Sequence, residues 1–386
     1  MSGGAYLDHA AATPLDPRVR EAMEPFLGGA GSPSSIHEWG RHPAEALERA
    51  RGQVAALVGA DEDGLIFTSG AVEARNLAVK GLLAGNRALG RHVVASAVEH
   101  PATLAACRTA ERAGAPLDLV RVDGEGRIAP AALAEAVRED TALVAVVHGQ
   151  PDIGTLQDVP ALAAAARAAR PEARVAVDAG ETAGLVPVDM ASMDADALVV
   201  GGTALGAPAW AGALAVRPGA RLHPLIEGGV EEGGKRAGAE ALPAIVALGA
   251  AAEIAREEMA ARAARMEALG ERLAAGLLAV PDVRLNGPRR GRIPGNVHVS
   301  AGWVEGESLA LAMAARGVAV SPGSACTAHG GKAAPTLEAI GLEPPWTHSA
   351  VLLTLRWTTT EAEVDAAVAA FADAVAALRA MSPLAP

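Results

Sequence analysis

Residues 142–177 read ALVAVVHGQPDIGTLQDVPALAAAARAARPEARVAV. The apolar runs at the two ends, 142–147 and 175–177, are short and rich in β-branched residues, which predicts two buried strands. The alanine-rich run at 161–169 between them predicts a helix. A strand, a helix and a second strand in this order predict two parallel strands joined by a helical crossover.

The same alternation extends in both directions from this stretch. Further buried strands are predicted at 65–67, 93–95 and 197–200, and another helix at 130–138. This rhythm predicts an α/β fold with a mostly parallel sheet between helices. Ligands of such folds bind at the carboxyl ends of the strands.

A second, smaller α/β unit is predicted in the last third of the chain. A long helical pattern at 243–278 leads from the first unit to the second, and strands are predicted at 283–285, 296–300 and 351–355, with helices at 307–315 and 361–379. We predict a large domain at 15–260. Residues 1–14 and 261–386 form the predicted small domain.

Composition limits the classes of partner. The chain has 386 residues, 51% of them hydrophobic, and a formal net charge of −12. This charge argues against a nucleic-acid or anionic-membrane partner, which needs a basic face. No run of about 18 apolar residues predicts a membrane span, and the start shows no secretion signal. We therefore expect a cytoplasmic protein.

Several motifs resemble those of cysteine desulfurases, which share the fold-type I pyridoxal-phosphate-enzyme fold with class V aminotransferases. The resemblance runs over nearly the whole chain. Its segments are YLDHAAATP (6–14), SSIH (34–37), FTSGAVE (67–73), Glu99-His100, VDA (177–179), GESL (306–309) and SPGSACT (321–327).

The resemblance implies roles for three residues. His100 corresponds to the histidine that stacks on the cofactor ring, Asp178 to the acid that pairs with the ring nitrogen, and Cys326 to the cysteine that carries sulfur as a persulfide. Position alone leaves plainer alternatives open. Asp178 could cap a turn, His100 could be an ordinary loop histidine, and Cys326 could be a small buried hydrophobe.

Other positions depart from the family pattern. The lysine that holds pyridoxal phosphate corresponds to Ala204, and the histidine before it to Thr203. A glutamine that faces the cofactor's phenolic oxygen corresponds to Glu181. The arginine that binds the substrate carboxylate corresponds to Leu352, or to Leu353 if the register shifts by one residue, and Arg356, four residues later, is not expected to replace it. These changes affect the covalent anchor, the phosphate, the ring oxygen and the substrate.

From these losses the sequence predicts a pseudoenzyme that lacks desulfurase activity. No cofactor is expected, or at most non-covalent pyridoxal phosphate in a vestigial cleft of His100, Asp178, Glu181 and Thr203. The predicted role is that of a partner or regulatory subunit, or a persulfide relay through Cys326, in sulfur transfer or iron–sulfur cluster assembly. Expected partners are a second copy, an active desulfurase, or a sulfur-acceptor or iron–sulfur assembly protein.

Two alternatives remain from the sequence. In the first, the chain is an active pyridoxal-phosphate-dependent cysteine desulfurase that releases alanine, with Lys332 or Lys235 in place of the lost lysine; the only other lysine is Lys80. In the second, Cys326 and His329 belong to a repurposed metal site that His100 and Asp178 complete.

Overall fold

The computed structural model describes residues 4–323 and 335–382. Strands β5 and β6 are neighbours in the middle of the larger sheet. Strand β5 (Thr141–Val147) pairs in parallel with β6 (Arg174–Asp178), and α7 (Val159–Ala169) connects them. Every residue of β5 is buried. The predicted parallel crossover is therefore confirmed.

The larger sheet has seven strands in the order β2-β8-β7-β6-β5-β3-β4. All neighbouring pairs are parallel except β2–β8 and β8–β7, so only β8 runs against the others. The mostly parallel sheet is confirmed. The remaining strands are β2 (Leu65–Thr68), β3 (His92–Ser96), β4 (Leu117–Val120), β7 (Ala197–Gly201) and β8 (Gly212–Val216).

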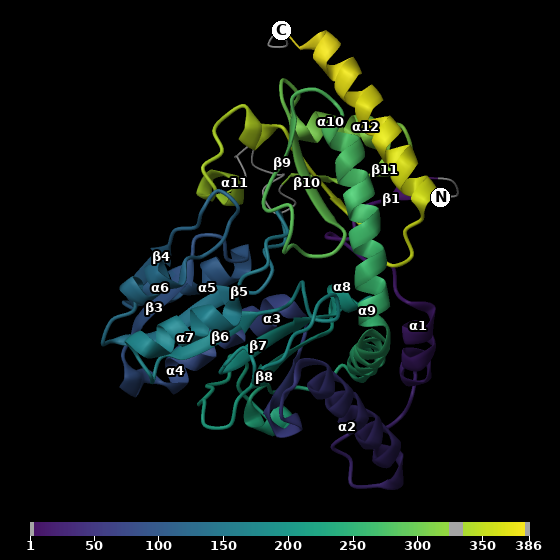
Figure 1. Ribbon diagram of the computed structural model, residues 1–386. Helices are drawn as coiled ribbons and strands as arrows, with labels where there is room; N and C mark the ends of the chain where they lie inside the picture. Colours follow the sequence, from purple (N-terminus) through teal and green to yellow (C-terminus); the bar gives the residue numbers. More distant parts are fainter. Residues whose placement is uncertain (1–3, 324–334, 383–386) are drawn as a thin grey trace.

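Two apolar cores cover the two faces of this sheet. Val144 and Val146 of β5 point into one core, whereas Leu143 and Ala145 point into the other, as the two-residue period of a strand requires. Figure 1 shows helices on both sides of the sheet. They are α1 (Pro17–Met23), α2 (Glu38–Val58), α3 (Ala71–Asn76), the π-helical turn η3 (Leu77–Gly81), α4 (Leu82–Gly85), α5 (Pro101–Arg112), α6 (Pro130–Ala136), α7 and α8 (Gly202–Leu205).

A four-stranded antiparallel sheet, in the order β12-β13-β10-β9, forms the second unit. Its core also receives Leu7 from the start of the chain. Strand β1 (Ala5–Tyr6) pairs in parallel with β11 (Val318–Ala319), which holds the N-terminal segment against this unit. The other elements are β9 (Val283–Leu285), β10 (Asn296–Ala301), α10 (Gly306–Ala314), β12 (Ser321–Pro322), α11 (Pro335–Ala339), β13 (Ala350–Thr354) and α12 (Glu361–Met381).

Helix α9 (Leu242–Leu278) joins the two units, as Figure 1 shows. With 37 residues it is about 55 Å long at 1.5 Å per residue. Leu248 in its first half packs in the core beside the large sheet, and Leu273 in its second half packs in the core of the small one. The predicted connecting helix is therefore confirmed, while the exact domain boundaries at 15–260 and 261–386 stay a prediction.

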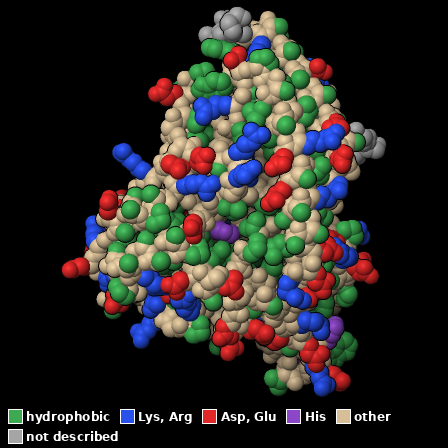
Figure 2. Space-filling model, in the orientation of Figure 1, with side chains coloured by type: hydrophobic (Ala, Val, Ile, Leu, Met, Phe, Trp, Pro, Cys, Tyr) green, Lys and Arg blue, Asp and Glu red, His purple; other side chains and the backbone are tan. Residues whose placement is uncertain are grey.

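Acidic and basic side chains are interspersed on the face of the molecule seen in Figure 2. Figure 2 shows acidic and basic side chains alternating over one face, with no continuous basic field, in agreement with the net charge of −12. Within the described ranges, every helix is too short or too polar to traverse a bilayer.

Five short 3-10 turns complete the secondary structure of the described residues: η1 (Glu24–Phe26), η2 (Glu62–Gly64), η4 (Arg87–Leu89), η5 (Glu231–Gly234) and η6 (Trp346–His348).

Candidate active site

The carboxyl ends of the parallel strands carry most of the residues selected from the sequence. Asp178 is the last residue of β6, His100 follows β3, and Thr203 and Ala204 follow β7. Because these strands are parallel, their carboxyl ends lie along one edge of the sheet. The fold therefore brings these residues to the same edge.

Asp178 forms a buried ion pair with Arg75 of α3. The Nε–Oδ2 distance is 2.6 Å, and the two side chains are 3% and 5% exposed. The backbone N–H of Gly180 donates to the other carboxylate oxygen at 3.0 Å. Burial alone would raise the pKa of Asp178, but the charge of Arg75 and its hydrogen bond outweigh burial and hold this pKa below its ordinary value.

Arg75 also contacts Glu181, which lies on the turn after β6. The Nη2–Oε1 distance is 3.3 Å, and the Glu181 side chain is 23% exposed. Sequence reasoning missed Arg75. The available signal was one arginine in a helix that begins directly after a buried strand and a glycine, which is where the carboxyl edge of the sheet lies.

His100 is the N-cap of α5. Its Nδ1 accepts a hydrogen bond from the backbone N–H of Ala102 at 3.0 Å, so the neutral ring carries its proton on Nε2. Burial, followed by the charge of Arg75, lowers the pKa of His100. The site therefore contains a neutral imidazole, and the predicted stacking role stays a prediction.

Glu99 links two strands beneath the site. One carboxylate oxygen accepts from Ser96 Oγ at 2.6 Å and from the Val147 backbone N–H at 2.8 Å, while Oε2 has no partner among the described residues. Burial raises the pKa of Glu99 to about 8. Glu99 is therefore a neutral carboxylic acid at neutral pH.

We expect this titration to appear in the stability of the protein. The unfolded chain releases the Glu99 proton near pH 4.5, whereas the folded chain keeps it to about pH 8. Within this window the folded state binds more protons, so the free energy of unfolding falls as pH rises, by up to about 1.4 kcal/mol per pH unit. Denaturant unfolding of wild type and Glu99→Gln from pH 5 to 8 measures this slope. The variant is expected to lose it, and equal slopes would contradict the assignment.

Ala204 is fully buried. It lies on α8 and packs in an apolar cluster with Leu185, Met266 and Ile293. Thr203 next to it is half-buried. No amine is present at position 204, and neither lysine in the described part of the chain contacts Asp178: Lys80 donates to Asn76 at 2.7 Å and Lys235 to the Leu222 carbonyl at 3.3 Å.

Leu352 and Arg356 occupy different environments around the end of β13. Leu352 is a buried strand residue opposite Ser321 and His298. Arg356 is also buried; its Nη1 donates to the Leu355 carbonyl at 3.0 Å, and its Nε has no partner among the described residues. Burial lowers the pKa of Arg356 to about 10, partly offset by the charge of Glu181. Arg356 is thus a cation that the described side chains satisfy incompletely.

Cys326, His329 and Lys332 lie outside the described residues. The segments on either side of them are anchored. Ser321 Oγ donates to the Asp8 carboxylate, and Thr336 Oγ1 donates to Asp152 Oδ2 at 2.8 Å. Within 4–323 and 335–382, no three His, Cys, Asp or Glu side chains form a metal cluster, and the predicted Cys326–His329 metal site stays untested.

Comparisons with known proteins cover almost the entire chain. The family model "Aminotransferase class-V" matches residues 5–367. The chain is 37% identical to "Cysteine desulfurase IscS" of Dictyoglomus turgidum over 99% of this chain and 97% of the relative. It is 40% identical to the protein of the same name from Azotobacter vinelandii, over 98% and 94%. A solved structure, "NIFS-LIKE PROTEIN", has a TM-score of 0.91 and 28% identity, and covers 97% of this chain and 100% of that one.

These relatives overturn three predictions. The pseudoenzyme, and with it the partner, regulatory or relay role without desulfurase activity, is wrong, because relatives that match along the full length are cysteine desulfurases. The expectation of no cofactor is wrong for the same reason, because members of this family depend on pyridoxal phosphate. Ala204 removes the amine at one position, whereas the similarity to cysteine desulfurases extends over the whole chain. The match along its whole length places this chain in the class-V aminotransferase family, beside the cysteine desulfurases.

Proposed function

We propose that this chain is a pyridoxal-phosphate-dependent cysteine desulfurase, which releases alanine from cysteine and takes up the sulfur on Cys326 as a persulfide. The observation that carries this proposal is the 36–40% identity to cysteine desulfurases along almost the full length. When bound, pyridoxal phosphate supplies an electron sink for cleavage at the substrate carbon. The sequence SPGSACT (321–327) supports Cys326 as the sulfur carrier.

Some residues fit the cofactor and others do not. The ionised Asp178 and the neutral His100 suit a protonated pyridine ring and its flat face. Ala204 offers no amine, however, and Arg75 already occupies one oxygen of Asp178. A covalently held cofactor therefore does not fit position 204.

The substrate carboxylate needs a cation, which Leu352 does not provide. Arg356 supports this role because its buried Nε lacks a partner among the described residues. We expect Arg356→Met to raise the KM for cysteine about 10- to 100-fold, since a charge-assisted hydrogen bond contributes roughly 1.5–3 kcal/mol, with a smaller change in kcat. Initial-rate kinetics measure both constants. Arg356→Lys, which keeps the charge, is the control; an unchanged KM in the methionine variant rejects this role.

We further propose that the chain works as a homodimer and passes sulfur to an acceptor such as an iron–sulfur assembly protein. Trp210, which is 63% exposed and lines a pocket together with Arg236, supports a self-association surface there. The heterodimer with an active desulfurase gains no support from the comparisons, and the cytoplasmic location stays a prediction.

The direct test of the proposed function is product analysis. Purified protein with L-cysteine and pyridoxal phosphate is expected to form L-alanine, quantified by amino-acid chromatography. D-cysteine serves as the control substrate. No alanine above the protein-free reaction overturns the proposal.

A further inference from the structure

The counter-ion of Asp178 in this chain is a side chain of the protein itself. Arg75 donates its Nε to Oδ2 at 2.6 Å, and the backbone N–H of Gly180 donates to Oδ1 at 3.0 Å. Both carboxylate oxygens are therefore engaged. Asp178 is 95% buried, so few further groups can reach it.

The backbone is shaped around the Arg75 guanidinium. A Cβ atom added to Gly180 would lie 2.6 Å from Arg75 Nη2 and 3.0 Å from Asp178 Oδ1, so a larger residue at this position requires the ion pair to shift. Glu181, at the far end of the same turn, contacts Nη2 at 3.3 Å. The turn after β6 thus holds the guanidinium between two carboxylates.

The charges at this site allow Asp178 to pair fully with one cation only. Removing one partner of a buried ion pair is strongly destabilising, because the other charge is left unpaired away from water. A second cation at Asp178 must therefore displace Arg75, which keeps only the partly exposed Glu181 as a partner. Two cations cannot both pair fully with one carboxylate.

We infer that Arg75 competes with the protonated ring nitrogen of a pyridoxal-type cofactor for Asp178, and that this competition sets the cofactor affinity of the chain. The ligand class is a 3-hydroxypyridine 5′-phosphate. The inference rests on the proposed function only for the identity of this ligand. The competition itself follows from the Arg75–Asp178 geometry.

The test uses pyridoxine 5′-phosphate, which has the ring nitrogen and the phosphate but no aldehyde. It therefore cannot condense with Lys80, Lys235 or Lys332 and reports on ring binding alone. Isothermal titration calorimetry compares the full-length wild type with Arg75→Asn. We expect the dissociation constant to fall at least about tenfold in the variant. Without Arg75 the charge of Asp178 is unpaired, and the protonated ring nitrogen of the ligand can neutralise it. An equal or weaker affinity overturns the inference.

Three further variants make the result specific. Arg75→Gln keeps a neutral hydrogen-bond donor at Asp178 and is expected to show the same gain if Arg75→Asn does not fold. Adding Asp178→Asn to either variant is expected to abolish the gain. Arg167→Asn disrupts a different ion pair, with the buried Asp196 elsewhere on the sheet, and is expected to leave the affinity unchanged. A gain that survives Asp178→Asn, or that appears in Arg167→Asn, contradicts the competition.

Failure of this inference is distinguishable from failure of the proposed function. Wild type that makes no alanine, together with tighter binding of the analogue by Arg75→Asn, overturns the function and supports the competition. Alanine formation with no gain in the Arg75 variants supports the function and overturns the competition.

Discussion

Cys326→Ser is expected to lose sulfur transfer by at least about a thousandfold, the loss typical of removing a catalytic nucleophile. A serine hydroxyl at neutral pH is a far weaker nucleophile toward sulfur than a thiolate. The measurement is transfer of radioactive sulfur from L-cysteine to the protein, followed by mass spectrometry of the peptide that contains residue 326. Retention of transfer in the serine variant would exclude Cys326 as the carrier.

The chain provides a matched control in its second cysteine. Cys107 lies on α5 and is fully buried, and burial raises its pKa to about 12. A thiol in this state is not a nucleophile at neutral pH. Cys107→Ser is therefore expected to transfer sulfur at close to the wild-type rate.

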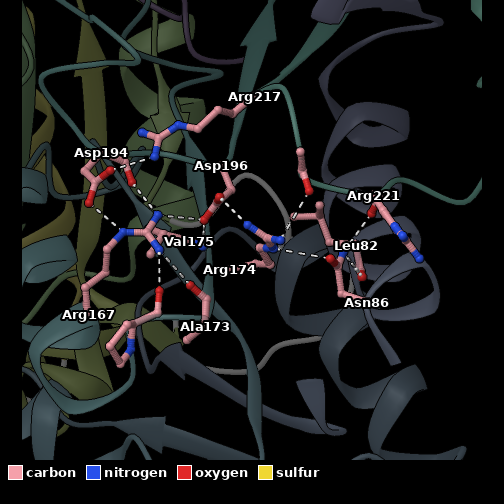
Figure 3. A network of polar contacts seen from close by, with 12 residues as sticks. Leu82, Asn86, Arg167, Ala173, Arg174, Val175, Asp194, Asp196, Arg217 and Arg221 are labelled. Carbon is pink, nitrogen blue, oxygen red and sulfur yellow. Dashed lines mark hydrogen bonds and ion pairs between the residues drawn. The ribbon is translucent and has the colours of Figure 1, made fainter. Parts of the chain in front are cut away.

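Asp196→Ala is expected to lower the free energy of unfolding by about 3–5 kcal/mol, because it removes a buried carboxylate with which two arginines pair. Asp196 is 1% exposed and accepts from Arg167 at 2.8 Å, from Arg174 at 3.1 Å and from the Val175 backbone N–H at 2.8 Å. Figure 3 shows it between the two arginines, with Asp194 and Arg217 extending the network. Removing it leaves the buried N–H of Val175 and the partly buried guanidinium groups of Arg167 and Arg174 with fewer acceptors.

Urea unfolding of Asp196→Ala and wild type measures this loss. Asp140→Ala is the control, because Asp140 pairs with Arg138 on the surface, where both side chains are about half exposed. A surface pair contributes about 0–1 kcal/mol, so this variant is expected to remain close to wild type. Similar losses in both variants would contradict the role assigned to burial.

The fold could be predicted from residues whose environment is set locally. The β-branched run at 142–147 forms β5, and the connecting helix predicted at 243–278 is observed as α9 over Leu242–Leu278. Strand β8 was missed because its sequence, GALAV, is small and mostly alanine and glycine, which carries little strand signal. Its burial and its pairing with β2 and β7 stabilise it instead.

The site was predictable only in part. Asp178 directly follows the apolar run 175–177 and is the last residue of β6, so its place at the carboxyl edge could be predicted from the sequence. Arg75 could not be paired with it, because 103 residues separate the two and the direction of the Arg75 side chain depends on how α3 packs. The function of the chain could not be inferred from Ala204 alone. Its methyl group excludes a covalent anchor there, but the similarity to cysteine desulfurases extends over 99% of the chain.

Sulfur balance in one turnover tests the desulfurase activity most directly. The protein is incubated with pyridoxal phosphate and limiting L-cysteine, and the same sample is analysed for free alanine and for persulfide on the peptide that contains Cys326. The account predicts one alanine for each sulfur atom bound to Cys326. Unchanged cysteine, with no alanine and no persulfide while pyridoxal phosphate is bound, would contradict it.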